Sequence, residues 1–481
     1  MFRHITDRAD RPRFAVPIAI MAALGAFTAL GGDAGAMAGI TVGCIVLWIL
    51  TPVPPAYTGV VGIGAMAAVF SPTLALSGFQ SSATWLVGFG LLMGIATQKS
   101  GLADLAGRWV TARSVPVPTS DDVSSGDGAS RTPDTGRVYR RLLLALALVA
   151  HVLALLVPSS LVRVLLLAPV LIEIGDRFES RRARIGLYLG PLFATFYGSS
   201  GVLTADLPNI IITGFAESVA GHPISWTTWV IHMYPVMGLT RVFLVVAVVY
   251  LLFRPDPGTT VRLGGVGAAK QLINDSGSVQ SARRMLVFLC LGGVIWMTDF
   301  LHGLDPVVGA IVVVVLAFLP EIGVVDFDVV GEELDVSVLF FIAAVLALGE
   351  GLAATGLSER AAVGLLETVS ADAPLAVALV LVFVTTVLLA FTMEGLAVAS
   401  VLTPVVITYA ESAGLPLTPV LMMEALGLST YFFPYQSAVL IAILAKSDVE
   451  TAELIRTTAA CSLATIVLLF PLQIAWFSLL Y

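Results

Sequence analysis

Between Pro158 and Asn209 the sequence is apolar enough to lie in a membrane, yet polar and helix-breaking residues interrupt it twice. The first interruption, Pro158–Ser160, separates two apolar arms that are each close to the shortest length able to span a bilayer. The second, Gly198–Asn209, interrupts a segment otherwise long enough to cross once. Non-helical backbone survives at membrane depth only where protein or a water-filled cavity satisfies its polar groups. We therefore expect a re-entrant hairpin followed by a broken helix, with both interruptions facing a site.

The remainder of the chain is also apolar. Of its 481 residues 58% are hydrophobic and 12% are charged, whereas soluble domains have roughly 45–50% apolar residues. The sequence therefore predicts an all-α polytopic protein of the plasma membrane. A net charge of -8 argues against nucleic acid as a partner. Because the sequence has neither a His-Glu-x-x-His nor a Gly-x-Ser-x-Gly motif, we do not expect the protein to be an enzyme.

Basic residues indicate the topology. Treating the apolar pairs 141–175 and 374–411 as re-entrant hairpins leaves about eleven transmembrane helices, with a cytoplasmic N-terminus and an external C-terminus. This arrangement places 22 of the 25 Lys and Arg residues on the cytoplasmic side. Such a bias follows the positive-inside rule and supports the two hairpins.

The expected organisation alternates scaffold and transport segments. Scaffold helices 1–4 occupy 1–110 and scaffold helices 7–9 occupy 285–373; cytoplasmic linkers, rich in Ser, Gly, Asp and Pro, occupy 111–139 and 253–284. A hairpin, a broken helix and a further helix occupy 140–252, and the same series recurs in 374–481.

The two halves resemble one another in sequence. GLLMGIATQKSGLADLAG near 90–107 is similar to VLALGEGLAATGLSERAAVG near 345–364, and each is followed by a hairpin, a proline and a broken helix. The repeat pairs Pro169 with Pro404 and Ser160 with Gly395. Since the first hairpin opens from inside and the second from outside, the repeats have inverted topology. Inverted repeats with breaks at the midplane are typical of alternating-access transporters whose site lies at the repeat interface.

Four motifs occur in an order and spacing that cover nearly the whole chain: LWILTPVPPAYTGVVGI at 47–63, KSGL at 99–102, Pro208-Asn209, and a Trp-His-Pro pattern at 226–235. Together they resemble the divalent anion/sodium symporters, the dicarboxylate and sulfate carriers of the ion-transporter superfamily. The resemblance implies a mobile unit of hairpins and broken helices that moves across the scaffold, and a homodimer.

The resemblance also implies a coupling-ion site. In that family each hairpin tip carries Ser-Asn-Thr and, with backbone carbonyls of the broken helices, forms a paired sodium site around the substrate anion. Here the tips read Ser159-Ser160-Leu161 and Glu394-Gly395-Leu396, so neither has the asparagine. Sodium, where it is the coupling ion, is expected at Ser159, Ser160 and Gly198, and a proton is the other candidate.

Side chains at the tips and breaks are the candidate substrate ligands, because hydroxyl donors beside helix N-termini suit an anion. They are Ser159, Ser160, Arg163, Ser199, Ser200, Thr204, Asn209, Gly395, Tyr435, Gln436 and Ser437. In membrane helices such serines also bond back to their own carbonyls, which is the structural alternative.

Glu394 and Asp206 are the candidate coupling residues, since an acid near mid-membrane is costly unless it is paired, hydrated or protonated. Glu394 binds a cation or a proton, or forms a structural salt bridge with Arg163. Arg163 in turn contacts the substrate or pairs with Asp206 or Glu394. For Arg241 a structural pair is favoured, and Glu350 and Glu424 are also interpreted as structural.

These patterns predict a secondary active transporter of small dianions, such as dicarboxylates or sulfate, coupled to Na⁺ or H⁺ and without a bound cofactor. A cation/proton antiporter or arsenite-type permease of the same superfamily is the first alternative. A non-transporting membrane receptor that kept the fold is the second.

Overall fold

The computed structural model describes residues 15–50, 55–103, 105, 135–261, 276–368 and 373–481. Several predicted features lie outside the described residues. They are most of the linker 111–139, nearly half of the linker 253–284, and the four N-terminal arginines expected in the cytoplasm. The described chain consists of helices, turns and loops, and its one isolated β-bridge joins Phe178 and Val261.

The helices of the N-terminal half are α1 (Ala15–Leu30), α2 (Gly32–Leu50), α3 (Pro55–Val69), α4 (Pro72–Ala75), α5 (Ser82–Lys99), α8 (Thr135–Leu156), α9 (Ser160–Gly175), α10 (Arg181–Tyr197), α11 (Leu207–Ser218), α12 (Trp226–Met233) and α13 (Arg241–Leu252). Those of the C-terminal half are α15 (Ser276–Met297), α16 (Asp299–His302), α17 (Pro306–Phe318), α18 (Val329–Glu333), α19 (Ser337–Ala354), α20 (Leu357–Thr368), α21 (Leu375–Ala390), α22 (Gly395–Ser412), α23 (Leu417–Leu428), α24 (Ala438–Ala445), α25 (Thr451–Ala464) and α26 (Phe470–Leu480).

Six helical stretches in the described residues are long and apolar enough to cross a membrane, and six shorter apolar helices accompany them. This confirms the predicted all-helical polytopic class. The sides on which the termini lie, and the re-entrant course of the hairpins, stay predictions.

Both hairpins and both breaks lie where the sequence predicts them. The helix α8 ends before Pro158, because the residue preceding a proline disfavours helical dihedrals. Ser159 then turns the chain with a φ of 76° and caps α9 through its hydroxyl. In the second hairpin the side-chain carboxylate of Glu394 caps α22 by accepting from the Leu396 N–H. The first break separates α10 from α11, and the second separates α23 from α24.

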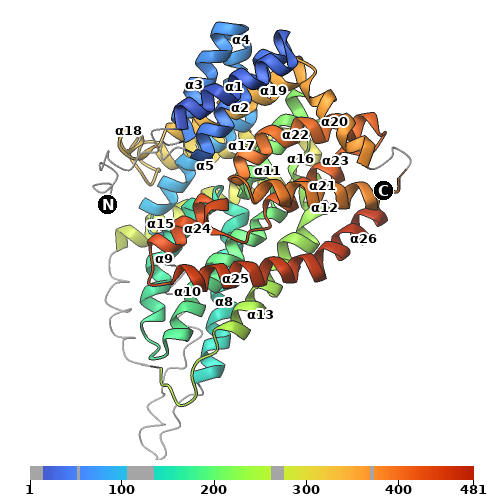
Figure 1. Ribbon diagram of the computed structural model, residues 1–481. Helices are drawn as coiled ribbons and strands as arrows, with labels where there is room; N and C mark the ends of the chain where they lie inside the picture. The colour runs from blue at the N-terminus through green and yellow to red at the C-terminus, as the bar shows by residue number, and fades with distance from the viewer. Residues whose placement is uncertain (1–14, 51–54, 104, 106–134, 262–275, 369–372) are drawn as a thin grey trace, which may run out of the picture.

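The packing of these elements repeats in the two halves. The first hairpin, α8–α9, packs against α10, and the second hairpin, α21–α22, packs against α23. The second parts of the broken helices cross over: α11 packs against α22, and α24 packs against α9. Figure 1 shows α11 and α22 side by side. Each hairpin therefore contacts its own broken helix and that of the other half.

The remaining helices form a second group. The helix α1 packs against α2 and α2 against α3, while α3 contacts α19 and α5 contacts α17. The N-terminal helices α1–α4, in blue in Figure 1, lie together at one end of the molecule. Helices of the segments 1–110 and 285–373 thus lie against one another.

Each half also ends in a long helix that contains a π-helical segment, which the sequence analysis did not predict. Tyr234–Thr240 joins α12 to α13, and Thr465–Leu469 joins α25 to α26. The π-helix frequently occurs near functional sites. The first segment contacts the first break, where Gly238 lies against Gly201. The second long helix, in red in Figure 1, runs across the molecule.

Candidate functional site

The first hairpin tip meets the first break at Ser160. Its Oγ lies 3.1 Å from Asp206 Oδ1, 3.2 Å from Ser199 Oγ and 3.2 Å from the carbonyl oxygen of Ala205. Ser160, Ser199 and Asp206 are all buried. Three residues predicted to form the site are therefore in direct contact.

Arg163 fastens this tip to the break. Its Nη1 donates to the carbonyl oxygens of Val157 at 2.7 Å and Ala205 at 3.1 Å. Its Nε donates to Thr195 Oγ1, and its Nη2 donates to Ser160 Oγ and to the carbonyls of Thr195 and Ala205. The side chain is 0% exposed. In the described part of the chain it has no carboxylate within ion-pair distance, so the expected pair with Asp206 or Glu394 is not formed.

Side-chain donors also satisfy the other carbonyls of the first break. Asn209 Nδ2 donates to the carbonyls of Ser199 and Val202, and Trp229 Nε1 donates to the carbonyl of Ser200. Trp226 Nε1 donates to Thr204 Oγ1 at 3.2 Å. The carbonyls of Ser199 and Val202 also accept from the backbone N–H groups of Val202 and Ala205 in two short 3-10 turns, and the side-chain donors reinforce this shape.

The second tip and the second break are joined by Gln436. Its Nε2 donates to the carbonyl of Ala390 at the end of the hairpin's first arm, and its Oε1 accepts from the backbone N–H groups of Phe432 and Phe433. Tyr435 Oη donates to the carbonyl of Phe391. An added Cβ on Gly395 would lie 3.7 Å from the carbonyl oxygen of Gln436, so the tip and the break touch.

Arg241 connects the two breaks. Its Nη1 donates to Ser200 Oγ at 3.1 Å and Ser429 Oγ at 2.9 Å, and its Nη2 donates to the Ser429 carbonyl at 2.8 Å. The guanidinium also lies 4.8 Å from the ring centre of Tyr197. Its Nε has no partner, although the residue is fully buried. No carboxylate of the described chain lies within ion-pair distance of it, contrary to the expected structural pair.

Four helices begin at the tips and breaks, and they pack in two pairs. In the first pair, α9 with α24, the capping residues are Ser159 and Ser437, which accept from the N–H groups of Val162 and Val439. In the second pair, α11 with α22, the capping residues are Asp206 and Glu394. Helix N-termini attract negative charge. The carboxylates of Asp206 and Glu394 supply negative charge at the second pair of helices, whereas the serines of the first pair supply none.

The structure thus brings each predicted hairpin tip against a predicted break, but many of the polar side chains there are hydrogen-bonded to backbone carbonyls. Ser199 and Ser200 donate to the carbonyls of Phe196 and Tyr197, the structural alternative for these hydroxyls. Roles for the predicted ligands stay predictions. Four further residues that bond to the breaks were not predicted, because nothing in the local sequence distinguishes a residue that bonds to a distant break: Thr195, Trp226, Trp229 and Ser429. No cluster of three or more His, Cys, Asp or Glu residues in the described ranges is placed to hold a metal ion.

Replacing Gly201 with alanine will destabilise the protein. A Cβ at this position would lie 2.5 Å from Gly238 Cα and 2.6 Å from its nitrogen, backbone atoms that cannot turn aside. Overpacking of this kind costs about 1–3 kcal/mol. Thermal unfolding of purified protein will report it. Gly331→Ala is the matched control, since nothing lies within 4 Å of its added Cβ; equal behaviour of the two variants contradicts the close approach.

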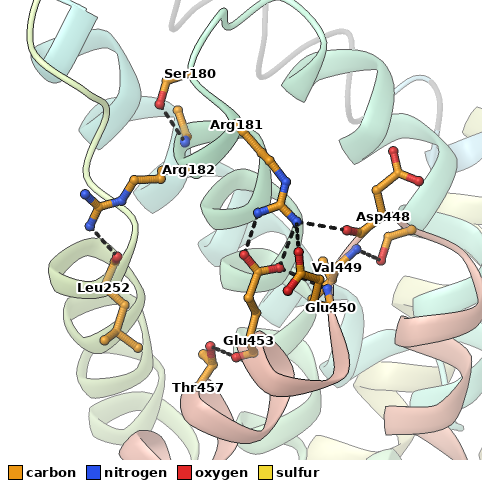
Figure 2. A network of polar contacts seen from close by, with 11 residues as sticks. Ser180, Arg181, Arg182, Leu252, Asp448, Val449, Glu450, Glu453 and Thr457 are labelled. Carbon is orange, nitrogen blue, oxygen red and sulfur yellow. Dashed lines mark hydrogen bonds and ion pairs between the residues drawn. The ribbon is translucent and has the colours of Figure 1, made fainter.

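A separate polar network joins the two halves far from the tips (Figure 2). Arg181, at the start of α10, forms two bonds to the Glu453 carboxylate, Nη1 to Oε1 at 2.6 Å and Nη2 to Oε2 at 3.1 Å, and contacts Glu450. The hydrogen bond to Glu453 raises the pKa of Arg181. Because α10 is about 25 Å long, this network lies outside the substrate site.

Paired hairpins, paired broken helices and polar backbone at their junctions define a multi-pass secondary transporter. The chain belongs to the CitMHS citrate transporter family, whose sequence model matches residues 45–427. It is therefore a transporter of small carboxylate anions and not an enzyme. The predicted class of transporter is confirmed. The more specific family that the sequence resembled, the divalent anion/sodium symporters, is confirmed only in part, as a related group of carriers.

Curated relatives and a solved structure agree with this family. The chain is 26% identical over 473 residues to the L-tartrate/succinate antiporter of Escherichia coli (strain K12), with 90% of both chains covered. It is 24% identical over 338 residues to a membrane protein of Cupriavidus necator, covering 66% of this chain and 61% of that one. The crystal structure of the Alcanivorax borkumensis YdaH transporter, described as having an unusual topology, matches 87% of this chain with a TM-score of 0.55 and 16% identity. That likeness shows the fold alone.

Proposed function

We propose that the chain transports four-carbon dicarboxylates of the succinate and tartrate type, held between the hairpin tips and the breaks. The support is the similarity to L-tartrate/succinate antiporters along 90% of both chains. Sulfate, the other anion predicted from the sequence, has no such support from the relatives.

The observation that carries the substrate's location is the packing of α9 against α24. Both helices begin at a serine, and their N-termini lack the carboxylate residue that stands at the N-cap position of each helix of the other pair. Two unneutralised N-termini with hydroxyl groups suit a substrate carboxylate. The carboxylates at the N-termini of α11 and α22 repel the substrate anion, so the two helix pairs together orient it. Arg241, buried without a carboxylate partner, supplies positive charge between the two breaks.

We further propose that transport does not depend on sodium. A sodium ion at the first tip would need backbone carbonyls and serine oxygens as ligands. Arg163 already donates to the carbonyls of Val157 and Ala205 and to Ser160 Oγ. At the second tip the amide of Gln436 donates to the carbonyl of Ala390. Fixed side-chain donors thus take the place of the cation, which favours exchange or proton coupling.

The finer assembly remains part of this proposal. The family resemblance supports a homodimer, and the cytoplasmic placement of 22 of 25 basic residues supports a cytoplasmic N-terminus and an external C-terminus in the plasma membrane. Light scattering of the purified protein will measure the first, and accessibility of a tag at each terminus will measure the second.

Proteoliposomes test the function. Labelled succinate will exchange for internal succinate or tartrate, and replacing sodium by choline on both sides will leave the rate unchanged. Absence of exchange for every dicarboxylate contradicts the substrate proposal. A sodium requirement contradicts only the role given to Arg163 and Gln436. Sodium–proton exchange without dicarboxylate flux would favour the antiporter alternative.

A further inference from the structure

Glu424 is a buried carboxyl group that the substrate site does not use. It lies on α23, five residues before Ser429 of the second break, and it is 0% exposed. One of its oxygens, Oε1, accepts a hydrogen bond of 2.8 Å from Thr403 Oγ1. The other oxygen, Oε2, has no hydrogen-bond partner among the residues that the structure describes.

The surroundings of Glu424 offer no compensating charge. The arm α21, which packs closely against α23, carries no titratable residue. The titratable residues on the other packed elements are Tyr409 and Glu411 on α22, Glu217 on α11 and His232 on α12; His222 meets Thr418 at the far end of α23, and Arg241 meets Ser429. None of them forms a hydrogen bond or an ion pair with Glu424 within the described residues.

A carboxylate cannot remain charged in such a place. An ionised acid buried without a cation costs several kcal/mol, and one hydroxyl donor does not offset that cost. The arrangement of donors therefore suits the neutral acid in this conformation. To release its proton Glu424 must reach water or a new donor, and this requires α23 and α22 to shift relative to one another.

The position of Glu424 couples that shift to transport. Its partner Thr403 lies on the second hairpin's arm, directly before Pro404, whereas Glu424 lies on the broken helix. The contact thus spans the hairpin and the broken helix of the second half. The corresponding elements of the first half differ: Ala168 precedes Pro169, and α10 contains no acidic residue.

The acids predicted as coupling residues are placed differently. Asp206 accepts from Ser160 Oγ and stands at the N-cap position of α11 without a side-chain capping bond, and Glu394 accepts from the Leu396 N–H and caps α22 while remaining only partly buried. Both receive donors and a helix N-terminus, which suit the charged form.

We propose that Glu424 is the residue that binds the coupling proton, which moves with the dicarboxylate and offsets one of its two negative charges. The proton passes from water to the Glu424 carboxylate on one side and from the Glu424 carboxyl group to water on the other, and no other group is transferred. This inference rests on dicarboxylate transport as proposed above, and it deepens that proposal by assigning the coupling ion and its residue.

Two transport modes in sodium-free proteoliposomes test the assignment. In wild-type protein, an inward proton gradient will stimulate net succinate uptake into vesicles without internal substrate. Glu424→Gln, which imitates the protonated acid, will keep succinate homo-exchange within about twofold of wild type. The same variant will lose the stimulation by the proton gradient. Glu411→Gln, an exposed acid on α22, is the matched control and will keep both modes.

Each other outcome has a definite meaning. Full proton stimulation in Glu424→Gln overturns the assignment, and its loss only in Asp206→Asn or Glu394→Gln moves the proton to those residues. Wild-type exchange without any response to pH overturns proton coupling but leaves dicarboxylate transport intact. Absence of wild-type exchange contradicts the proposed function itself.

A second measurement covers the case in which Glu424→Gln does not fold. A hydrophobic carbodiimide, which modifies protonated carboxyl groups in apolar surroundings, will label Glu424 in wild-type protein and abolish proton-stimulated uptake. Peptide mass spectrometry will locate the label. Loss of proton-stimulated uptake with Glu424 unlabelled overturns the proposal.

Discussion

Replacing Arg163 with methionine will abolish most transport and lower the melting temperature. The change removes the guanidinium donors from the buried carbonyls of Val157, Thr195 and Ala205, of which Ala205 keeps only the bond from Ser160 Oγ. Each unsatisfied group costs about 1–3 kcal/mol, so a loss of transport of at least tenfold is expected. Lysine at the same position will restore part of the activity, because one ammonium group cannot reach the tip, the break and α10 together.

The order wild type, lysine, methionine in both uptake and melting temperature is the result expected for Arg163. Arg283, an exposed arginine on α15, provides the control, since its change to methionine will leave both quantities unaltered. A methionine variant with wild-type transport would show that the tip and the break do not need the guanidinium.

Replacing Arg241 with methionine will weaken substrate binding and slow transport. The side chain joins the two breaks through Ser200 and Ser429 and carries a buried positive charge without a carboxylate partner. Losing a charged hydrogen-bonding group of this kind costs about 2–3 kcal/mol, roughly 30- to 100-fold in affinity. The shift of the melting temperature with succinate measures binding, and exchange in proteoliposomes measures transport.

Lysine at position 241 separates charge from connection. If positive charge between the breaks attracts the anion, Arg241→Lys will keep succinate binding closer to wild type than Arg241→Met does. Because a single ammonium cannot reproduce both bonds to Ser429, its exchange rate will still fall. Equal succinate binding in all three proteins would contradict a role for this charge.

Much of the architecture follows from local patterns. Polar runs such as Pro-Ser-Ser and Gly-Ser-Ser-Gly inside an apolar segment favour an interrupted helix, and with the sequence repeat they located both hairpins and both breaks. Proline alone does not interrupt a helix here, since Pro169, Pro191 and Pro404 lie inside α9, α10 and α22. The recurrence of this series also indicated which residues would meet. The π-helical segments could not be predicted in this way, because their apolar pattern is that of the neighbouring α-helix.

The partners of the charged residues required the structure. The sequence suggested ion pairs for Arg163 and Arg241, since a buried charge is usually paired. The structure instead satisfies Arg163 with backbone carbonyls that lack helical donors, which is a consequence of the break itself. Glu424 was interpreted as structural, and its unpartnered oxygen becomes visible only when α21, α22 and α23 are packed together.

The sequence by itself determined a polytopic carrier with two hairpins and two breaks, because membrane length and helix interruption are local constraints on the backbone. Only the tertiary structure decided how the four helices that begin at the tips and breaks pair, and therefore which N-cap residues each pair carries. The pairing arises because α24 packs on α9 and α11 packs on α22. The paired residues lie more than two hundred positions apart in the first case and nearly two hundred in the second. Such contacts depend on the summed shapes of whole helices, and no local pattern encodes them.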